Sequence, residues 1–235
     1  MPSESLTYSE KLELLRLLEE KERRIRYNQF DNWFPDTGPL RRELYPKHLL
    51  FFEQGSIHRE RLFMAGNRVG KTIAGGYEVT CHLTGNYPHW WVGRRFDKPV
   101  KVLAAGDTRA TTRDIIQEKM LGVYEDLGTG LIPKASIFGQ PSRVQGISKA
   151  YEEVKVKSAF GGNSTMMLRS YDQGRKIFQG FEADIIWLDE EVPQDIYAEA
   201  LIRTMTTNGL LIMTFTPLNG LTPLVVDFME TAGLL

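Results

Sequence analysis

A short apolar run that enters a glycine-containing loop constrains the fold of this chain most. Residues 61–65 read RLFMA, the length of a buried strand, and residues 66–72 read GNRVGKT. A polyphosphate with its metal ion requires backbone N–H groups without side-chain hindrance, one long cation and a hydroxyl. The residues after Thr72 suit a helix whose N-terminus would face the phosphates. The segment therefore predicts a strand, a phosphate-binding loop and a helix, in that order.

The cation and the hydroxyl of this loop are Lys71 and Thr72. We expect Lys71 to reach the β and γ phosphates and Thr72 to bind Mg²⁺. Ala65 stands where the usual spacing has glycine, and alanine is small enough to make the turn. On these residues alone, a glycine-rich turn that holds no ligand stays open as an alternative. The predicted nucleotide-binding loop comprises Ala65, Gly66, Asn67, Arg68, Val69, Gly70, Lys71 and Thr72.

A second apolar run ends in carboxylates. Residues 185–188 read IIWL, which suits a strand buried on both faces of a parallel sheet. Asp189 and Glu190 follow at its C-terminal end, where open α/β sheets bind ligands. We expect Asp189 to bind Mg²⁺ through water and Glu190 to orient and deprotonate an attacking water. An acidic, solvated loop ahead of Pro193 is the alternative, and the phosphate-binding loop upstream disfavours it.

Composition sets limits on the other functions of the chain. Its 235 residues suffice for one large α/β core, and its formal net charge is −1. DNA contact would therefore need a local basic surface or a ring of subunits. The single cysteine, Cys81, excludes an internal disulfide, and the four histidines are too scattered for a zinc site. With no long apolar run and no signal peptide, we expect a cytosolic protein without membrane attachment.

The chain divides into an N-terminal segment and a core. Residues 7–10 have capping-box spacing, and apolar residues at helical intervals predict an amphipathic helix over residues 8–26. We assign residues 1–44 to this helix and a connector, and residues 45–235 to the α/β core. A further helix is expected just before the phosphate-binding loop. Its Tyr45, His48 and Gln54 are candidates for contacting adenine, although a buried aromatic helix explains the same residues.

The remaining core elements follow from apolar patterns and turn residues. We expect a loop over residues 122–145 and a hairpin or two antiparallel strands at residues 151–157 and 164–170. The other expected elements are strands at 101–106 and 209–216 and helices at 108–121 and through 198–205.

The last predicted strand ends in the sequence TFTP. Thr214 or Thr216 would lie beside the γ-phosphate in a parallel sheet and pass its presence to the segment after Pro217. Hydroxyls that merely end a strand before a proline account for the residues equally well.

Taken together, AGNRVGKT, the segment SYDQGRKIFQG at residues 170–180, IIWLDEE and TFTP closely resemble the ATPase half of phage terminase large subunits, the motors that package viral DNA. The resemblance covers nearly the whole chain after about Tyr45 and rests on the order and spacing of all four motifs. It implies an α/β P-loop NTPase fold of the ASCE type, with a mostly parallel central sheet flanked by helices, plus the N-terminal helix.

The resemblance also implies roles for single residues. Lys71 and Thr72 match the Walker A element, Asp189 the Walker B metal position and Glu190 the catalytic carboxylate. Residues 214–217, with Thr214, Thr216 and Pro217, match the motif that couples hydrolysis to movement.

Arginines complete the implied site. Arg68 matches a loop arginine with a catalytic or sensing role in these motors, and a solvated loop arginine is the alternative. Related motors also use an arginine from the neighbouring subunit, placed shortly before the acidic strand. Gln179 stands nearest that position here, so Arg175 is our first choice for this role, with Arg169 and Arg143 behind it. Such an arginine would neutralise charge that develops on the γ-phosphate.

The implied ligands and partners are ATP, Mg²⁺, double-stranded DNA, a portal protein and a small terminase subunit. The implied assembly is a homo-oligomeric ring, a pentamer on the procapsid, with a monomeric isolated domain, in the cytoplasm of the infected bacterial host. The family's nuclease domain would lie beyond Leu235, so we expect no nuclease activity. A helicase or recombination-type ATPase and a nucleotide-dependent assembly module without turnover are the alternative functions.

Overall fold

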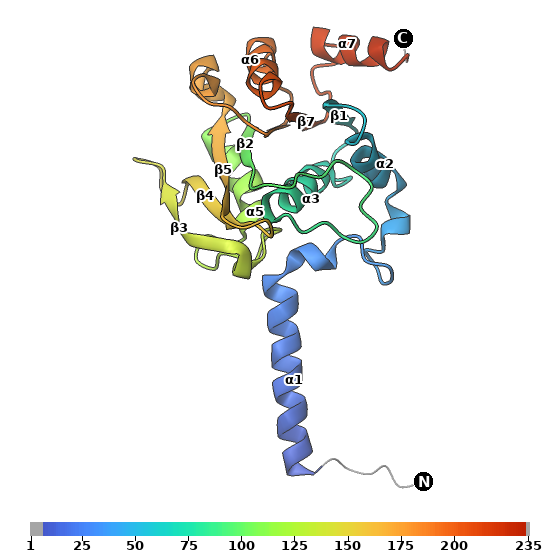
Figure 1. Cartoon of the computed structure of the whole chain (residues 1–235), viewed down its shortest axis with the longest axis vertical. Coiled ribbons are helices and arrows are strands. Elements are labelled where there is room, and N and C mark those ends of the chain that lie inside the picture. Colours follow the sequence, from blue (N-terminus) through green and yellow to red (C-terminus); the bar gives the residue numbers. More distant parts are fainter. Residues whose placement is uncertain (1–6, 234–235) are drawn as a thin grey trace.

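Seven strands form one sheet in the part of the chain that the computed structural model describes, residues 7–233. The strands are β1 (Glu60–Met64), β2 (Lys101–Gly106), β3 (Ile137–Arg143), β4 (Tyr151–Lys157), β5 (Asn163–Ser170), β6 (Ile185–Asp189) and β7 (Leu210–Phe215). Their order across the sheet is β1-β7-β6-β2-β5-β4-β3 (Figure 1). The first five are parallel to their neighbours, and β4 and β3 add an antiparallel extension. The mostly parallel sheet confirms the predicted fold class.

Helices cover both faces of this sheet, except for α1, which has no buried side chain. The longer ones are α1 (Tyr8–Tyr27), α2 (Pro46–Gln54), α3 (Lys71–Thr84), α6 (Gln194–Met205) and α7 (Pro223–Thr231). Short helical segments complete the chain: η1 (Gln29–Asn32), η2 (Arg42–Leu44), α4 (Arg109–Thr111), η3 (Thr112–Gln117), α5 (Glu118–Leu121), η4 (Lys134–Ser136), η5 (Tyr171–Gln173) and η6 (Arg175–Phe178).

The sheet buries a different core on each face. Strand side chains alternate between faces, so Ile185 and Trp187 pack with α3, whereas Ile186 and Leu188 pack with α6 and α7. Both positions of each pair are fully buried, which explains the continuous apolar run of β6. The alternation also decides which side chains at the strand ends can face α3.

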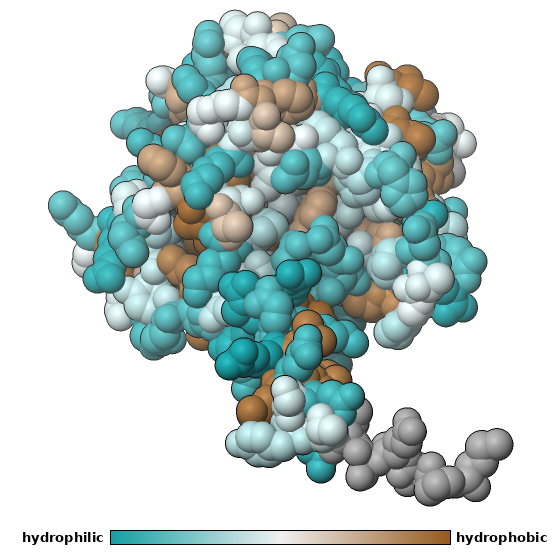
Figure 2. Space-filling view, turned by 60° about the horizontal axis from the view of Figure 1, so that its bottom comes forward, coloured by the Kyte–Doolittle hydropathy of each residue, from teal (hydrophilic) through white to brown (hydrophobic). Residues whose placement is uncertain are grey.

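The N-terminal helix stands apart from these cores. α1 projects from the body in Figure 1, and none of its side chains is buried. The predicted capping box is present, because Thr7 Oγ1 accepts from the Glu10 N–H and Glu10 accepts from the Thr7 N–H. Figure 2 shows apolar surface along this helix. Its exposed leucines are Leu12, Leu14, Leu15, Leu17 and Leu18.

The connector after α1 packs into the core. Phe30 stacks on Tyr77 of α3 with ring centroids 4.5 Å apart, and Phe34 is buried against the rings of α2 and α3. No helix among the described residues has the length and apolar character needed to cross a membrane.

Most predicted elements are confirmed, and one prediction is wrong. Residues 122–145 were expected to form a loop, but they contain β3, an edge strand whose pairing with β4 is irregular. Gly139 and Pro141 break its pattern, and its side chains are mostly exposed, so no alternation of apolar residues marks it. The helix expected over residues 108–121 is present, but a π-helical turn, η3, interrupts it.

Candidate active site

The phosphate-binding loop runs from the end of β1 to the start of α3. Gly70 precedes α3 with a φ of 86°, a left-handed conformation that favours glycine. Arg68 also has a positive φ, 62°, and its side chain is exposed. The ammonium of Lys71 donates to Gly66 O at 2.6 Å and to Thr216 Oγ1 at 2.8 Å. Thr216 in turn donates to Asn67 Oδ1 at 2.8 Å, so the end of β7 is bonded to the loop.

The second motif meets the first at the carboxyl end of β6. Asp189 is 2% exposed, and both of its carboxylate oxygens lie 3.2 Å from Thr72 Oγ1. Thr214 donates to Asp189 Oδ1 at 2.5 Å. The pKa of Asp189 is raised to about 7, mainly by burial and also by the nearby Glu190, against the opposing effect of the bonds from Thr214 and Thr72. Two segments 117 residues apart in the chain are thus in direct contact.

The alternation of side chains along the strands explains why Asp189 and Thr214 face α3. Asp189 lies on the same face of β6 as Trp187, the face that packs against α3, and Thr214 lies on the same face of β7. Trp187 Nε1 donates to Thr214 Oγ1 at 2.8 Å. The indole also fills the space beside Gly75 of α3, where an added Cβ would lie 2.5 Å from Nε1. The sheet therefore holds the Asp189 carboxylate against the first turn of α3.

The backbone of Glu190, directly after β6, departs from the extended conformation of the strand. Its φ of 71° is left-handed, which is rare and costly for a residue other than glycine. The backbone is held there by bonds on both sides, since its N–H donates to Thr214 O at 3.0 Å and its carbonyl accepts from the Tyr171 hydroxyl at 3.3 Å. Tyr171 also donates to Asp189 O at 3.0 Å. A fixed, strained backbone at a carboxylate is typical of catalytic positions.

Sequence reasoning missed Tyr171 and Trp187 as supports of this site. Tyr171 lies within the segment SYDQGRKIFQG, which was recognised without a role for the tyrosine. Trp187 was assigned only to a buried run. A donor-bearing aromatic in an otherwise aliphatic strand was the available signal, because a buried indole N–H requires an acceptor.

The three adenine candidates occupy different places. His48 is 7% exposed and lies beneath the loop, where a Cβ added to Gly70 would be 3.0 Å from its Nε2. Burial lowers the pKa of His48, so the ring is neutral near pH 7. Tyr45 and Gln54 lie at opposite ends of α2, a helix of nine residues that spans roughly 13 Å. The structure thus brings His48 to the loop and separates the other two, and adenine contact stays a prediction for all three.

The candidate trans arginines differ in how they are held. Arg175 donates from Nε to the buried Glu199 at 2.8 Å, and its side chain is 54% exposed. Arg169 uses Nη1 for backbone carbonyls and for Glu152, at 3.3 Å. Arg143 lies over the ring of Tyr124, with 5.8 Å from its guanidinium carbon to the ring centroid. Arg175 is therefore anchored through Nε, and within residues 7–233 its two terminal nitrogens have no hydrogen-bond partner.

The donor set suits a magnesium ion. Asp189 and Thr72 supply a carboxylate and a hydroxyl, the hard oxygen donors that Mg²⁺ takes alongside substrate phosphates. A buried carboxylate with a raised pKa gains from a cation beside it. Within residues 7–233, no group of three or more His, Cys, Asp or Glu side chains is placed to hold a metal by itself. Lys71, Thr72 and Asp189 converge as predicted for a phosphate and metal site.

Comparisons with known proteins agree with these observations. The family model described as the N-terminal part of the terminase large subunit, T4likevirus-type, matches residues 62–233. The terminase large subunit of Salmonella phage P22 is 34% identical, over 97% of this chain and 48% of that protein. The chain thus spans about half the length of this curated relative. A large terminase from a thermophilic bacteriophage, solved in complex with ADP, matches 72% of this chain and 38% of that chain at 16% identity, with a TM-score of 0.45.

The family match covers the phosphate-binding loop, the acidic strand and the TFTP strand end, all of which meet at one edge of the sheet. The chain therefore belongs to the terminase large subunit family, whose N-terminal domain it contains.

Proposed function

We propose that the chain is the ATPase module of a viral DNA-packaging motor, which hydrolyses ATP to translocate double-stranded DNA into a procapsid. Membership of the terminase large subunit family supports this proposal. The observation that carries it is the contact between Thr72 and Asp189, at 3.2 Å, beside the ammonium of Lys71. A cation, a hydroxyl and a carboxylate at one strand edge are what hydrolysis of a Mg²⁺–triphosphate complex needs.

Each residue of the site would have a definite task. The loop from Ala65 to Gly70 would hold phosphate oxygens through its N–H groups, and Lys71 would exchange its bonds to Gly66 and Thr216 for the β and γ phosphates. Mg²⁺, held by Thr72 and Asp189, would neutralise charge on those phosphates. Glu190 would orient the attacking water and accept its proton.

Two arginines would stabilise charge that develops at the γ-phosphate. Arg68 would act from within the loop of its own subunit. Arg175 would act on the neighbouring subunit, because Glu199 holds its Nε and leaves both terminal nitrogens to form a fork toward phosphate oxygens. We keep Arg169 and Arg143 as lesser candidates, since both guanidinium groups already have partners on their own chain.

The strand end at residues 214–217 would couple hydrolysis to movement. Thr214 is bonded to Asp189 and Thr216 to Lys71, so the two threonines contact opposite sides of the proposed phosphate site. Loss of the γ-phosphate would change both contacts at once, and Pro217 would carry the change into the segment that leads to α7. Tyr45, His48 and Gln54 stay proposed adenine contacts, with His48 acting through the loop.

The proposed setting is the cytoplasm of an infected bacterium. There the chain would form a pentameric ring on the procapsid, with a portal protein and a small terminase subunit as partners, and would be a monomer when isolated. We place the ATPase core at residues 45–235, after the N-terminal helix and connector. The findings favour neither a helicase-type ATPase nor an assembly module without turnover.

A carboxylate replacement tests the proposed function. Glu190→Gln should keep Mg²⁺-dependent ATP binding while turnover falls by about 100-fold or more, because only the water-activating group is lost. Glu191→Gln is the matched control, since Glu191 is the adjacent carboxylate and is bonded to Asn219 Nδ2 at 2.9 Å. Normal turnover in Glu190→Gln would refute the assignment, and absence of turnover in the unchanged chain at every concentration would favour the assembly module.

A further inference from the structure

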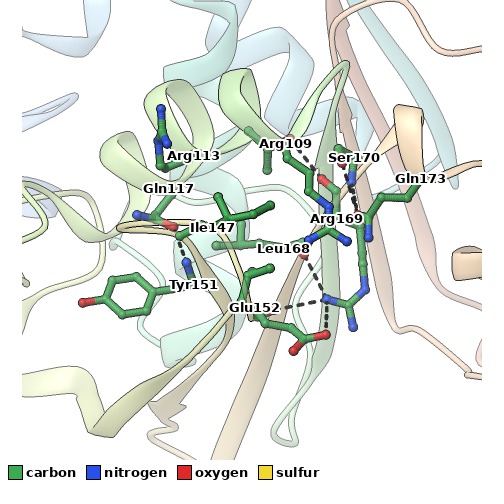
Figure 3. A pocket seen from close by; sticks show the side chains of 13 residues that line it. Arg109, Arg113, Gln117, Ile147, Tyr151, Glu152, Leu168, Arg169, Ser170 and Gln173 are labelled. Carbon is green, nitrogen blue, oxygen red and sulfur yellow. Dashed lines mark hydrogen bonds and ion pairs between the residues drawn. The ribbon is translucent and has the colours of Figure 1, made fainter.

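A small cavity lined by arginines lies beside the carboxyl end of β5. It is about 30 Å³ in volume and open on one side. Arg109 and Arg113, from the helical segment after β2, and Arg169, from β5, line it, and Figure 3 shows the Arg113 side chain pointing away from the other two. Gln173 and Glu152 also line it. We call this cavity with its three arginines the arginine pocket.

In the part of the chain that the structure describes, two of the three arginines of the pocket are paired with carboxylates, and Arg109 is not. Arg113 is neutralised outside it by Asp114, with bonds of 2.6 and 3.0 Å, and Arg169 by Glu152 at 3.3 Å. Arg109 is half-buried, and among residues 7–233 no carboxylate lies within ion-pair distance of its guanidinium. A partly desolvated cation beside two others is costly unless an anion joins them.

The donors that remain available suit an oxyanion. Among the described residues, the guanidinium of Arg109 has no hydrogen-bond partner, and Arg169 uses only Nη1. The Gln173 side chain accepts from Ser170 N at 3.0 Å and Ser170 Oγ at 3.1 Å through Oε1, which leaves its Nε2 as a donor. Guanidinium forks bind phosphate oxygens in pairs and with directional preference.

The small size of the pocket limits the size of the group that it can hold. A cavity of about 10–15 Å³ by this measure holds one water, so the pocket has room for roughly two and can take part of a phosphate. Two exposed cations are close to the lining in the chain. Arg143 precedes Val144 of the lining, and Lys149, whose carbonyl accepts from Gln117 at 2.8 Å, has its ammonium paired with Glu125 at 3.0 Å. A pocket for one phosphate, with further cations nearby, suits a nucleic-acid backbone, in which phosphates follow one another, better than a single free anion.

We propose that the arginine pocket holds a backbone phosphate of duplex DNA. This deepens the proposed function and rests on it for the choice of duplex DNA. The pocket adjoins the catalytic carboxylate, since Ser170 and Gln173 flank Tyr171, whose hydroxyl bonds the carbonyls of Asp189 and Glu190. A phosphate bound in the pocket would contact the neighbours of Tyr171, which holds the backbone at Glu190.

The test measures binding of random-sequence duplex DNA to the 235-residue chain without nucleotide, across salt concentrations. Arg109→Gln should weaken binding about tenfold and reduce the salt slope by about one phosphate contact, while basal ATP turnover stays unchanged. Arg16→Gln, which removes an exposed charge from α1, is the matched control and should change neither quantity. Arg109→Glu should weaken binding further than Arg109→Gln.

Equal affinity and equal salt slope for Arg109→Gln and Arg16→Gln would overturn the proposal. Inorganic phosphate provides the second arm. If it binds the chain tightly in an Arg109-dependent way while DNA affinity is unaffected, the pocket is a small-anion site and the DNA proposal fails. Because the assay contains no ATP, failure of the proposed ATPase function would appear separately, as absent turnover in the unchanged chain.

Discussion

The hydroxyl of Thr214 donates to the carboxylate of Asp189 at 2.5 Å, across the neighbouring strands β7 and β6. The same hydroxyl oxygen accepts from Trp187 Nε1, so Thr214, Asp189 and a core indole form one chain of hydrogen bonds. The sequence analysis placed Thr214 or Thr216 beside the γ-phosphate. In the structure, Thr214 contacts Asp189 and Thr216 contacts Lys71, so the two threonines bond to different residues of the site.

Replacing Thr214 by valine should weaken magnesium binding. Thr214→Val removes the donor that holds the pKa of Asp189 down, so the carboxylate becomes harder to ionise. It also leaves Trp187 Nε1 buried without an acceptor, at a cost of about 1–3 kcal/mol of unfolding free energy. We expect the magnesium concentration that supports half-maximal ATP binding to rise about tenfold. Thr214→Ser keeps the hydroxyl and should behave as the unchanged chain, and equal behaviour of both variants would contradict the prediction.

Stability should depend on pH through Asp189. Its pKa is about 7 in the folded chain and 3.8 when unperturbed, so the folded state binds the proton more tightly than the unfolded state. The contribution of this group to unfolding free energy is therefore present below about pH 4 and is lost as pH rises to about 7. Urea unfolding of the metal-free chain and of Asp189→Asn at several pH values measures it. The difference between the two should fall with rising pH, and a constant difference would refute the assignment.

Adding one methyl group to α3 should destabilise the chain. Gly75→Ala places a Cβ 2.5 Å from Trp187 Nε1 and 2.7 Å from Cε2, which the packed core cannot absorb without a shift. Overpacking costs about 1–3 kcal/mol, against about 0.5–1 kcal/mol gained in helix propensity. Chemical unfolding should therefore show a net loss. Combining Gly75→Ala with Trp187→Phe should cost less than the sum of the single changes, and strict additivity would exclude this contact as the cause.

The trans role of Arg175 predicts complementation between defective subunits. Arg175→Ala should lower the part of ATP turnover that rises with protein concentration, because each subunit keeps its own phosphate site. Mixing it with Lys71→Ala should restore activity, since the second variant still supplies Arg175 to its neighbour. Arg203→Ala is the control, because Arg203 shares Glu199 with Arg175 from the buried side. Activity of the mixture no greater than that of its components would exclude Arg175 from this role.

Elements that local sequence patterns mark were predicted correctly. Features that depend on contacts between distant residues were not. The apolar run of β6 and the glycines of the loop mark their elements directly, and the convergence of Lys71, Thr72 and Asp189 follows from the meeting of strand ends in a parallel sheet. The edge strand β3 has no alternating pattern because little of it is buried. The position of His48 beneath Gly70, and the bonds of Tyr171 to the carbonyls after β6, depend on packing between distant segments.

Because β7 lies between β1 and β6, it sets the distance between the loop after β1 and the acid at the end of β6. Neighbouring strands lie about 4.8 Å apart, so the ends of β1 and β6 are separated by roughly 10 Å. Because β7 is hydrogen-bonded to β1 on one side and to β6 on the other, the sheet itself keeps the loop and the acidic strand end at this spacing.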